Sequence, residues 1–361
     1  MERKPLPIGI EDFKRLIDDK YYFVDKTLMI KELIESQTIV GLFTRPRRFG
    51  KTLNMSMIQR FFEKTDESNA YLFDGLKISE FPECMQYQGQ YPVISLSLKS
   101  MKQATFEEAF AVFKDLIRAE TLRHKSVLFQ NDAIEKTDLD RLTRFIELKA
   151  EKSDYNTSLG FLSRLLASAY NKNVIILIDE YDVPLENAFY QGFYTDMVNL
   201  IRSVFESALK TNSSLDRAFL TGCLRVSKES IFTGLNNLDI FTIISPMFTD
   251  SFGFTPDEIT DILKYYKLED KANEIKDWYD GYLFSDTQTY NPWSTINHIK
   301  NLTVNPNYPC KPYWSNTSSN EIVKRLIEES NDRTKNAIEE LINGTPVRAQ
   351  IYEDITYGTI D

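Results

Sequence analysis

Short apolar runs alternate with longer amphipathic stretches through the first two thirds of the chain. Five strands are predicted by runs rich in β-branched or aromatic residues, at 39–43, 93–98, 174–178, 217–222 and 241–245. Helical periodicity predicts helices at 52–62, 159–170, 195–210 and, with a break near 130–132, at 105–152. Because helices separate the strands, we expect an α/β fold with a mainly parallel sheet flanked by helices.

The pattern changes after about residue 250. From Asp257 onward the sequence has helical segments and an aromatic stretch, but no convincing buried strand. We therefore predict two domains, an α/β domain over residues 1–250 and a smaller, mostly helical lid or transmitter domain over 251–361. The aromatic clusters around Trp278 and Trp293 are interpreted as core of the second domain rather than as a surface for stacking nucleic-acid bases.

The loop after the first predicted strand has the features of a phosphate loop. Gly50-Lys51-Thr52 matches the end of the motif GxxxxGK[ST], in which backbone N–H groups and the lysine bind phosphates and the Ser/Thr hydroxyl binds Mg²⁺. Arg45 replaces the first glycine of that motif, and Pro46 fixes one φ angle. We expect ATP to be bound by the loop and the first turn of the following helix: Arg45, Pro46, Arg47, Arg48, Phe49, Gly50, Lys51, Thr52 and Leu53.

Two other interpretations of this loop remain open. It could be a basic turn with a solvated lysine, or its arginines could contact nucleic-acid phosphates, although they lie in a loop and not along an exposed helix face. Arg45, Arg47 and Arg48 are more cations than one triphosphate needs. We therefore expect at least one of these arginines to form a structural salt bridge.

A second candidate motif follows the strand at 174–178, whose consecutive apolar residues suit a strand buried on both faces. Asp179 at its end is expected to bind Mg²⁺ together with Thr52, and Glu180 to activate the attacking water, with Asp182 as the next candidate. One predicted strand separates the two motifs in the sequence, as in ATPases that use a catalytic glutamate.

The next strand end supplies candidates for contacts with the γ-phosphate. Thr221 lies there, and Arg225 or Lys228 could stabilise charge in the transition state. Pairing of these two cations with nearby acids is an equally good interpretation.

These motifs belong to a wider resemblance, which extends to about residue 320. The chain resembles the bacterial AAA-ATPase-like family in the segments around Pro7-Ile8-Gly9 and YFVDKT, and in RPRRFGKT, IDEYD, TGCLRVSKESIFTGLNNL, FGFT, WYDGY and YNPWS. The resemblance implies a P-loop NTPase in which Lys51 and Thr52 bind nucleotide and Mg²⁺ and Asp179-Glu180 is the Walker B pair. Many similar proteins continue into a PD-(D/E)xK nuclease-like domain. The sequence stops at Asp361, about where that domain would begin, so it is either a fragment of a longer protein or a short member of the family, and the nuclease is not carried over.

Composition narrows the range of partners. The formal net charge of −10 opposes binding to nucleic acid and anionic membranes, and no apolar run has the length of a signal peptide or membrane span. We expect a cytoplasmic protein without membrane association. The cysteines Cys84, Cys223 and Cys310 form no CxxC pair and are expected to be reduced, while His124 and His298 are expected to be surface or packing residues.

The sequence thus predicts Mg²⁺-dependent ATP binding and hydrolysis, with Glu180, Lys51 and Arg225 as catalytic residues. Two alternatives remain, a nucleotide-gated interaction module with negligible turnover and an ATPase stimulated by DNA or RNA. A homo-oligomer or a protein partner is also left open. The half-motif Glu147-x-Lys149 lacks a preceding strand and aspartate, so we assign no nuclease site.

Overall fold

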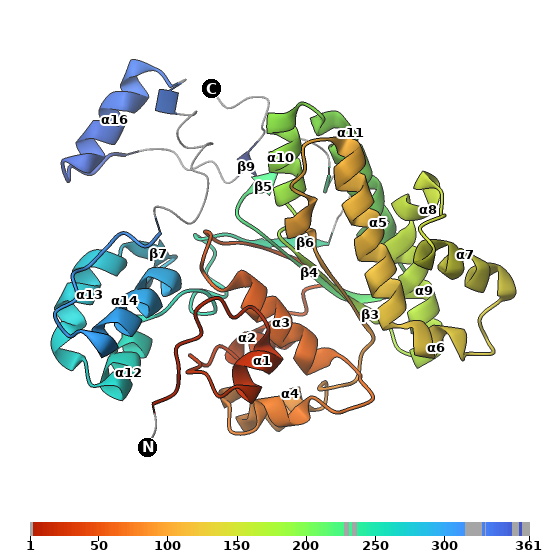
Figure 1. The fold of residues 1–361 in the computed structure, drawn as a ribbon, viewed down its shortest axis with the longest axis horizontal. Coiled ribbons are helices and arrows are strands. Elements are labelled where there is room, and N and C mark those ends of the chain that lie inside the picture. Colours follow the sequence, from red (N-terminus) through yellow and green to blue (C-terminus); the bar gives the residue numbers. More distant parts are fainter. Residues whose placement is uncertain are drawn as a thin grey trace.

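The computed structural model describes residues 3–226, 231–232, 237–314, 327–328, 330–348 and 354–355. Its centre is a five-stranded sheet in the order β2-β3-β4-β1-β6, in which every neighbouring pair is parallel (Figure 1). The strands are β1 (Val40–Thr44), β2 (Val93–Ser97), β3 (Val174–Asp179), β4 (Leu215–Gly222) and β6 (Leu238–Phe241). The predicted α/β fold with a parallel sheet is confirmed.

The fifth predicted strand is misplaced. The sequence predicts it at 241–245, whereas β6 ends at Phe241. The following residues form a turn, in which the N–H of Ser245 donates to the carbonyl oxygen of Thr242 at 3.2 Å. Ile243 and Ile244 are 38% and 47% exposed, so this apolar run does not mark a buried strand.

Successive side chains along each strand point to opposite faces of the sheet, so the sheet separates two apolar cores. On one face, Ile175 and Phe219 pack in a core with α1 (Phe13–Asp18), α2 (Leu28–Glu35), α3 (Lys51–Phe62) and α4 (Pro82–Met85). On the other face, Ile176 and Leu220 pack in a core with α5 (Phe106–Arg123), α9 (Ser158–Tyr170), α10 (Val183–Gln191) and α11 (Tyr194–Phe205). Helices on both faces leave the carboxyl edge of the sheet free for a site.

Most predicted helices are present. The predicted break near 130–132 is confirmed between α6 (Lys125–Phe129) and α7 (Lys136–Ile146), but the same stretch is also interrupted at His124 and between α7 and α8 (Lys152–Asn156). The helix predicted at 195–210 ends at Phe205 and continues as a π-helical turn over Glu206–Lys210. The sequence did not predict α10, whose Pro184 lies in the first helical turn, where a missing N–H has no cost.

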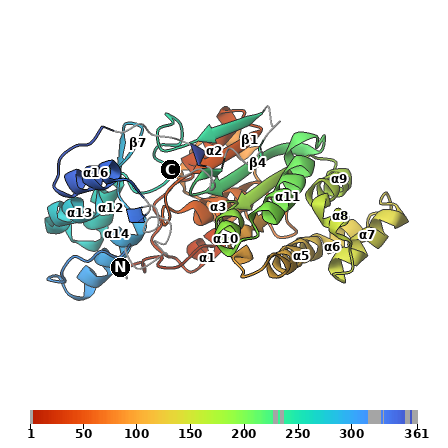
Figure 2. The ribbon, with the colours of Figure 1, turned by 90° about the horizontal axis from the view of Figure 1, so that it is seen from above.

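A third core holds the C-terminal helices together at one end of the molecule (Figure 2). It is formed by α12 (Pro256–Tyr266), α13 (Ala272–Tyr279) and α14 (Pro292–Val304), beside an antiparallel hairpin of β7 (Tyr282–Phe284) and β8 (Thr287–Thr289). Beyond it, the structure describes α16 (Asp332–Ile342) and the pairing of β5 (Arg225–Val226) with β9 (Asp354–Ile355).

The third core also takes in Leu6, Tyr22 and Val24 from the start of the chain, while Phe284 packs in the core under the sheet. Contacts therefore cross residue 250 in both directions, and the division into two domains at this residue stays a prediction. Tyr279 and Tyr290 are core residues as expected, but the expectation is wrong for Trp278, which is 53% exposed.

Gly253 lies where the C-terminal helices meet the loop before α3. Its φ is +80°, and a Cβ atom there would lie 2.1 Å from Thr289 Cγ2 and 3.0 Å from Phe49 Cδ1. The backbone at Gly253 is thus wedged between β8 and the loop that contains Phe49, which fixes the distance between them.

We expect Gly253→Ala to lower the free energy of unfolding by about 2–4 kcal/mol, because the left-handed backbone and the forced repacking both destabilise the fold. Gly9→Ala is the matched control, since Gly9 has a φ of +76° but open space around its Cβ position. It should cost only about 1–2 kcal/mol. Urea unfolding of both variants checks this, and equal losses would contradict the close packing at Gly253.

Candidate functional site

The loop between β1 and α3 contains a run of backbone N–H groups without acceptors among the residues that the structure describes. Gly50 caps α3 with a φ of +83°, a left-handed conformation that glycine adopts readily, and Arg48 has a φ of +71°. Within the described part of the chain, the N–H groups of residues 47–53 have no hydrogen-bond acceptor. Free N–H groups at the positive end of a helix form a site for an anion.

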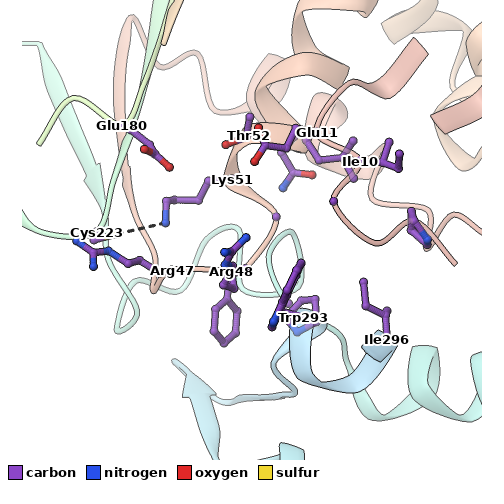
Figure 3. Close-up of a pocket in the computed structure, with 18 of the residues that line it drawn as sticks. Ile10, Glu11, Arg47, Arg48, Lys51, Thr52, Glu180, Cys223, Trp293 and Ile296 are labelled. Carbon is purple, nitrogen blue, oxygen red and sulfur yellow. Dashed lines mark hydrogen bonds between the residues drawn. The ribbon is translucent and has the colours of Figure 1, made fainter. Parts of the chain in front are cut away.

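Lys51 lies across the base of this loop. Its side chain is 6% exposed, and its Nζ donates to the carbonyl oxygens of Arg45 and Pro46 at 2.9 and 3.0 Å. It also lies 3.5 Å from the Sγ of Cys223, whose pKa is raised by burial (Figure 3). The ammonium group is therefore held beside the free N–H groups of the loop, and the hydrogen-bond acceptors given for it are neutral.

Asp179 joins three elements at the carboxyl edge of the sheet. Its Oδ2 accepts a hydrogen bond from Thr52 Oγ1 at 2.8 Å, and its Oδ1 accepts one from Thr221 Oγ1. The Thr221 hydroxyl also accepts the N–H of Glu180 at 3.3 Å. Because Mg²⁺ prefers oxygen ligands, the Thr52 hydroxyl and the Asp179 carboxylate fit this ion.

Glu180 follows Asp179 in a strained conformation, with a φ of +54°. A left-handed backbone costs a non-glycine residue about 1–3 kcal/mol and is concentrated at functional sites. Burial raises the pKa of the half-buried Glu180 carboxyl, and the charge of Asp179 raises it further. Such a carboxylate is a stronger base than an exposed one.

Asp182 has a different position from the one expected of a reserve base. It is 1% exposed, and its Oδ2 accepts the N–H groups of Cys223 and Leu224 at 2.7 and 3.0 Å. Burial raises the pKa of this carboxyl. Asp182 therefore fixes the segment after β4 in front of Lys51.

Arg45 is buried, and its side chain reaches the segment after β6. Its guanidinium donates to the carbonyl oxygens of Thr44, Phe241 and Phe248 at 3.0, 2.7 and 3.2 Å, and it lies 5.1 Å from the ring centres of Phe252 and Phe284. The backbone N–H of Arg45 donates to the carbonyl oxygen of Gly222. Arg45 was expected to contact ATP, but in the structure it ties the loop to the segment after β6.

The two other arginines face the cavity. Arg47 forms the expected structural salt bridge, with its Nη2 2.8 Å from Glu186 Oε2. Arg48 is exposed and lies 4.3 Å from the ring centre of Trp293. Trp293 thus lines the site from α14, although the sequence had been interpreted as placing it in a core.

A cavity of about 530 Å³ opens in front of the loop, within the usual range of small-molecule sites (Figure 3). One side carries Lys51, Glu180 and the loop, and the other includes the apolar residues Ile10 from the N-terminal segment and Ile296 from α14. Sequence reasoning did not assign the N-terminal segment or α14 to the site. The available signal was that the motifs Pro7-Ile8-Gly9 and YNPWS carry part of the family resemblance.

The expected site residues fall into three groups. The cavity is lined by Arg47, Arg48, Phe49, Gly50, Lys51, Thr52, Leu53 and Glu180. Behind this lining lie Arg45, Pro46, Asp179 and Thr221, which contact the loop or the lining residues. The side chain of Arg225 and all of Lys228 lie outside the described residues.

A family profile described as "Predicted AAA-ATPase" matches residues 7–232, more than half of the chain. The chain belongs to this family. An "Uncharacterized protein in vnfD 5'region" from Azotobacter chroococcum mcd 1 is 27% identical over 331 residues, which cover 91% of this chain and 57% of that protein. The chain therefore spans little more than half the length of this relative. Among the described helices of this AAA-ATPase-like protein, none has the length and apolarity needed to cross a bilayer.

Arg45→Ala should lower the free energy of unfolding by about 3–5 kcal/mol, because it leaves buried carbonyl groups without donors. Arg48→Ala in the same loop is the control and should cost less than about 1 kcal/mol, the usual value of an exposed cation–π contact. Chemical denaturation of both variants measures the difference. A near-neutral Arg45→Ala would contradict the structural role of this arginine.

Proposed function

We propose that this AAA-ATPase-like protein binds ATP in a Mg²⁺-dependent manner and hydrolyses it. The observation that carries the proposal is the meeting of the unpaired loop N–H groups and Lys51 with the hydrogen-bonded set Thr52, Asp179 and Thr221. Groups that can donate hydrogen bonds to phosphate and oxygen atoms that can bind Mg²⁺ then lie on adjacent elements. A metal–triphosphate complex requires this combination.

The ATP phosphates would bind the N–H groups of residues 47–53, with the Lys51 ammonium exchanging its carbonyl partners for phosphate oxygens. The nucleoside would extend toward the apolar part of the cavity, where Ile10, Trp293 and Ile296 lie. Arg47 is held by Glu186 at the rim and can turn toward the phosphates if that salt bridge opens.

Mg²⁺ would be held by Thr52 and Asp179, and when bound it would neutralise charge on the phosphate oxygens. The Thr221 hydroxyl would orient the Asp179 carboxylate, to which it donates a hydrogen bond. It also accepts the backbone N–H of Glu180 and so would hold the backbone that positions the Glu180 side chain. Glu180 would accept a proton from water as the water oxygen attacks the γ-phosphorus. The bond between that phosphorus and the β-γ bridging oxygen breaks, and ADP leaves.

A nucleotide-gated interaction module without turnover is the second candidate. The contact between Arg48 and Trp293 favours it, because a nucleotide at the loop would compete with this link to the C-terminal helices. The net charge of −10 counts against the DNA- or RNA-stimulated ATPase. The cytoplasmic location and a homo-oligomer or protein partner stay predictions.

Lys51→Ala should abolish measurable ATP binding by calorimetry. It removes the ammonium group that lies at the base of the loop, next to the free N–H groups that would bind the phosphates. Lys136→Ala, on the exposed face of α7, is the control and should bind like the wild type. Circular dichroism checks that both variants fold. Unchanged affinity in a folded Lys51→Ala variant would remove the loop from the account.

Glu180→Gln should keep ATP affinity and lose turnover by about 10²–10⁴-fold, because the amide is isosteric but cannot accept the proton. Phosphate release measures turnover, and Glu107→Gln, at an exposed position in the first turn of α5 outside the cavity, is the control and should turn over like the wild type. A wild type that binds ATP without turnover would favour the gated module. Wild-type turnover in Glu180→Gln would contradict the assigned base.

The pH profile of turnover should reflect the raised pKa of Glu180. The base must be ionised to act, so the rate should fall on the acid side around a pKa above the usual value of about 4.3 for glutamate. The measurement is kcat between pH 4.5 and 8, over the range in which the protein stays folded. A kcat that stays constant down to pH 4.5 would contradict this environment.

A further inference from the structure

Three potential metal ligands meet in the C-terminal helices, away from the nucleotide cavity. Glu274 comes from α13, His298 from α14, and Cys310 from the segment that follows α14. Cys310 Sγ lies 3.2 Å from Glu274 Oε1 and 3.4 Å from His298 Nε2, and these last two atoms are 3.5 Å apart. The same three atoms thus form a nearly equilateral triangle.

This triangle matches one face of a tetrahedral zinc site. Zinc bonds of roughly 2.0–2.1 Å to oxygen and nitrogen and roughly 2.3 Å to sulfur, at tetrahedral angles, place the nitrogen and oxygen atoms roughly 3.3 Å apart and each of them roughly 3.5 Å from the sulfur. The observed separations of 3.5 Å for N···O, 3.4 Å for S···N and 3.2 Å for S···O lie within roughly 0.3 Å of these values. A thiolate, an imidazole and a carboxylate together are also a ligand set that zinc accepts, with a fourth position for water.

The arrangement differs from that of a nucleophile triad. In such a triad the nucleophile and the carboxylate contact opposite nitrogens of the histidine. Here the Cys310 thiol and the Glu274 carboxylate both approach Nε2, while Nδ1 has no hydrogen-bond partner among the described residues. Three donors that converge on one point are the geometry of ligands around a cation.

The surroundings hold the ligands in place. The fully buried imidazole of His298 lies among the rings of Tyr279, Tyr308 and Tyr313, at centre distances of 5.3, 6.4 and 6.3 Å. Lys271 engages the other carboxylate oxygen of Glu274, Oε2, at 3.3 Å. Glu274 is one-third exposed, which gives an ion and a water molecule access.

We propose that Glu274, His298 and Cys310 bind one Zn²⁺ ion, which joins α13, α14 and the segment after α14. Binding forms a zinc–sulfur bond and releases the thiol proton to solvent. Because Nδ1 lacks the second hydrogen bond that usually orients a histidine ligand, the affinity should be about 10–100-fold below that of a fully supported site. The site does not depend on the proposed ATPase activity.

Co²⁺ is the probe, because a thiolate–cobalt bond gives a near-ultraviolet charge-transfer band. Chelator-treated protein is titrated with Co²⁺ in excess Mg²⁺, and bound Zn²⁺ is then measured by competition. The wild type should bind one Co²⁺ with this band, and Zn²⁺ should abolish it. Cys310→Ser should lose the band, while Cys84→Ser, at a buried cysteine in the core below the sheet, should keep it.

Two further variants test the role of Glu274 and the independence of the zinc site from the nucleotide site. Glu274→Gln, at a partly exposed position, should keep the fold by circular dichroism and weaken Co²⁺ binding about tenfold or more. Lys51→Ala should bind Co²⁺ like the wild type, whether or not ATP binding is lost. The absence of a band in the wild type, its persistence in Cys310→Ser, or unchanged affinity in Glu274→Gln would overturn the zinc site.

Discussion

The candidate site depends on one buried carboxylate that is shared by two hydroxyl groups. Asp179 ends β3 and holds Thr52 at the start of α3 on one oxygen and Thr221 near the end of β4 on the other. This fixes the loop between β1 and α3, the acidic end of β3 and the strand β4 relative to one another. A buried carboxylate must be paired to be tolerated, so the same contacts that satisfy it also align the site.

The features of this site that depend on short sequence motifs could be predicted from the sequence. The apolar run at 174–178 indicates a strand buried on both faces, and a parallel sheet then brings Asp179 and Thr221 to the same edge as Gly50-Lys51-Thr52. In the structure β4 lies between β1 and β3, so the two motifs are separated in the sheet by one strand that supplies Thr221. The roles of these residues in binding and catalysis stay predictions.

What could not be predicted depends on contacts between distant residues. An arginine in a basic loop is expected in solvent or on phosphate, yet Arg45 is buried because the carbonyl groups of Phe241 and Phe248, about 200 residues away, accept its hydrogen bonds. The same holds for Trp293, which reaches the cavity from α14, and for Cys310, which meets Glu274 and His298 only in the folded chain. The local pattern of residue types along the chain carries no information on contacts between residues so far apart.

The central claim is that Thr52 and Asp179 form the metal end of a nucleotide site. It is tested most directly by calorimetric titration of ATP into the wild type and Asp179→Asn, each in Mg²⁺ and in chelator. The account predicts that Mg²⁺ tightens wild-type binding about tenfold or more, close to 1.4 kcal/mol, and that Asp179→Asn loses this difference. Equal wild-type affinity with and without Mg²⁺, or an undiminished Mg²⁺ effect in Asp179→Asn, would contradict it.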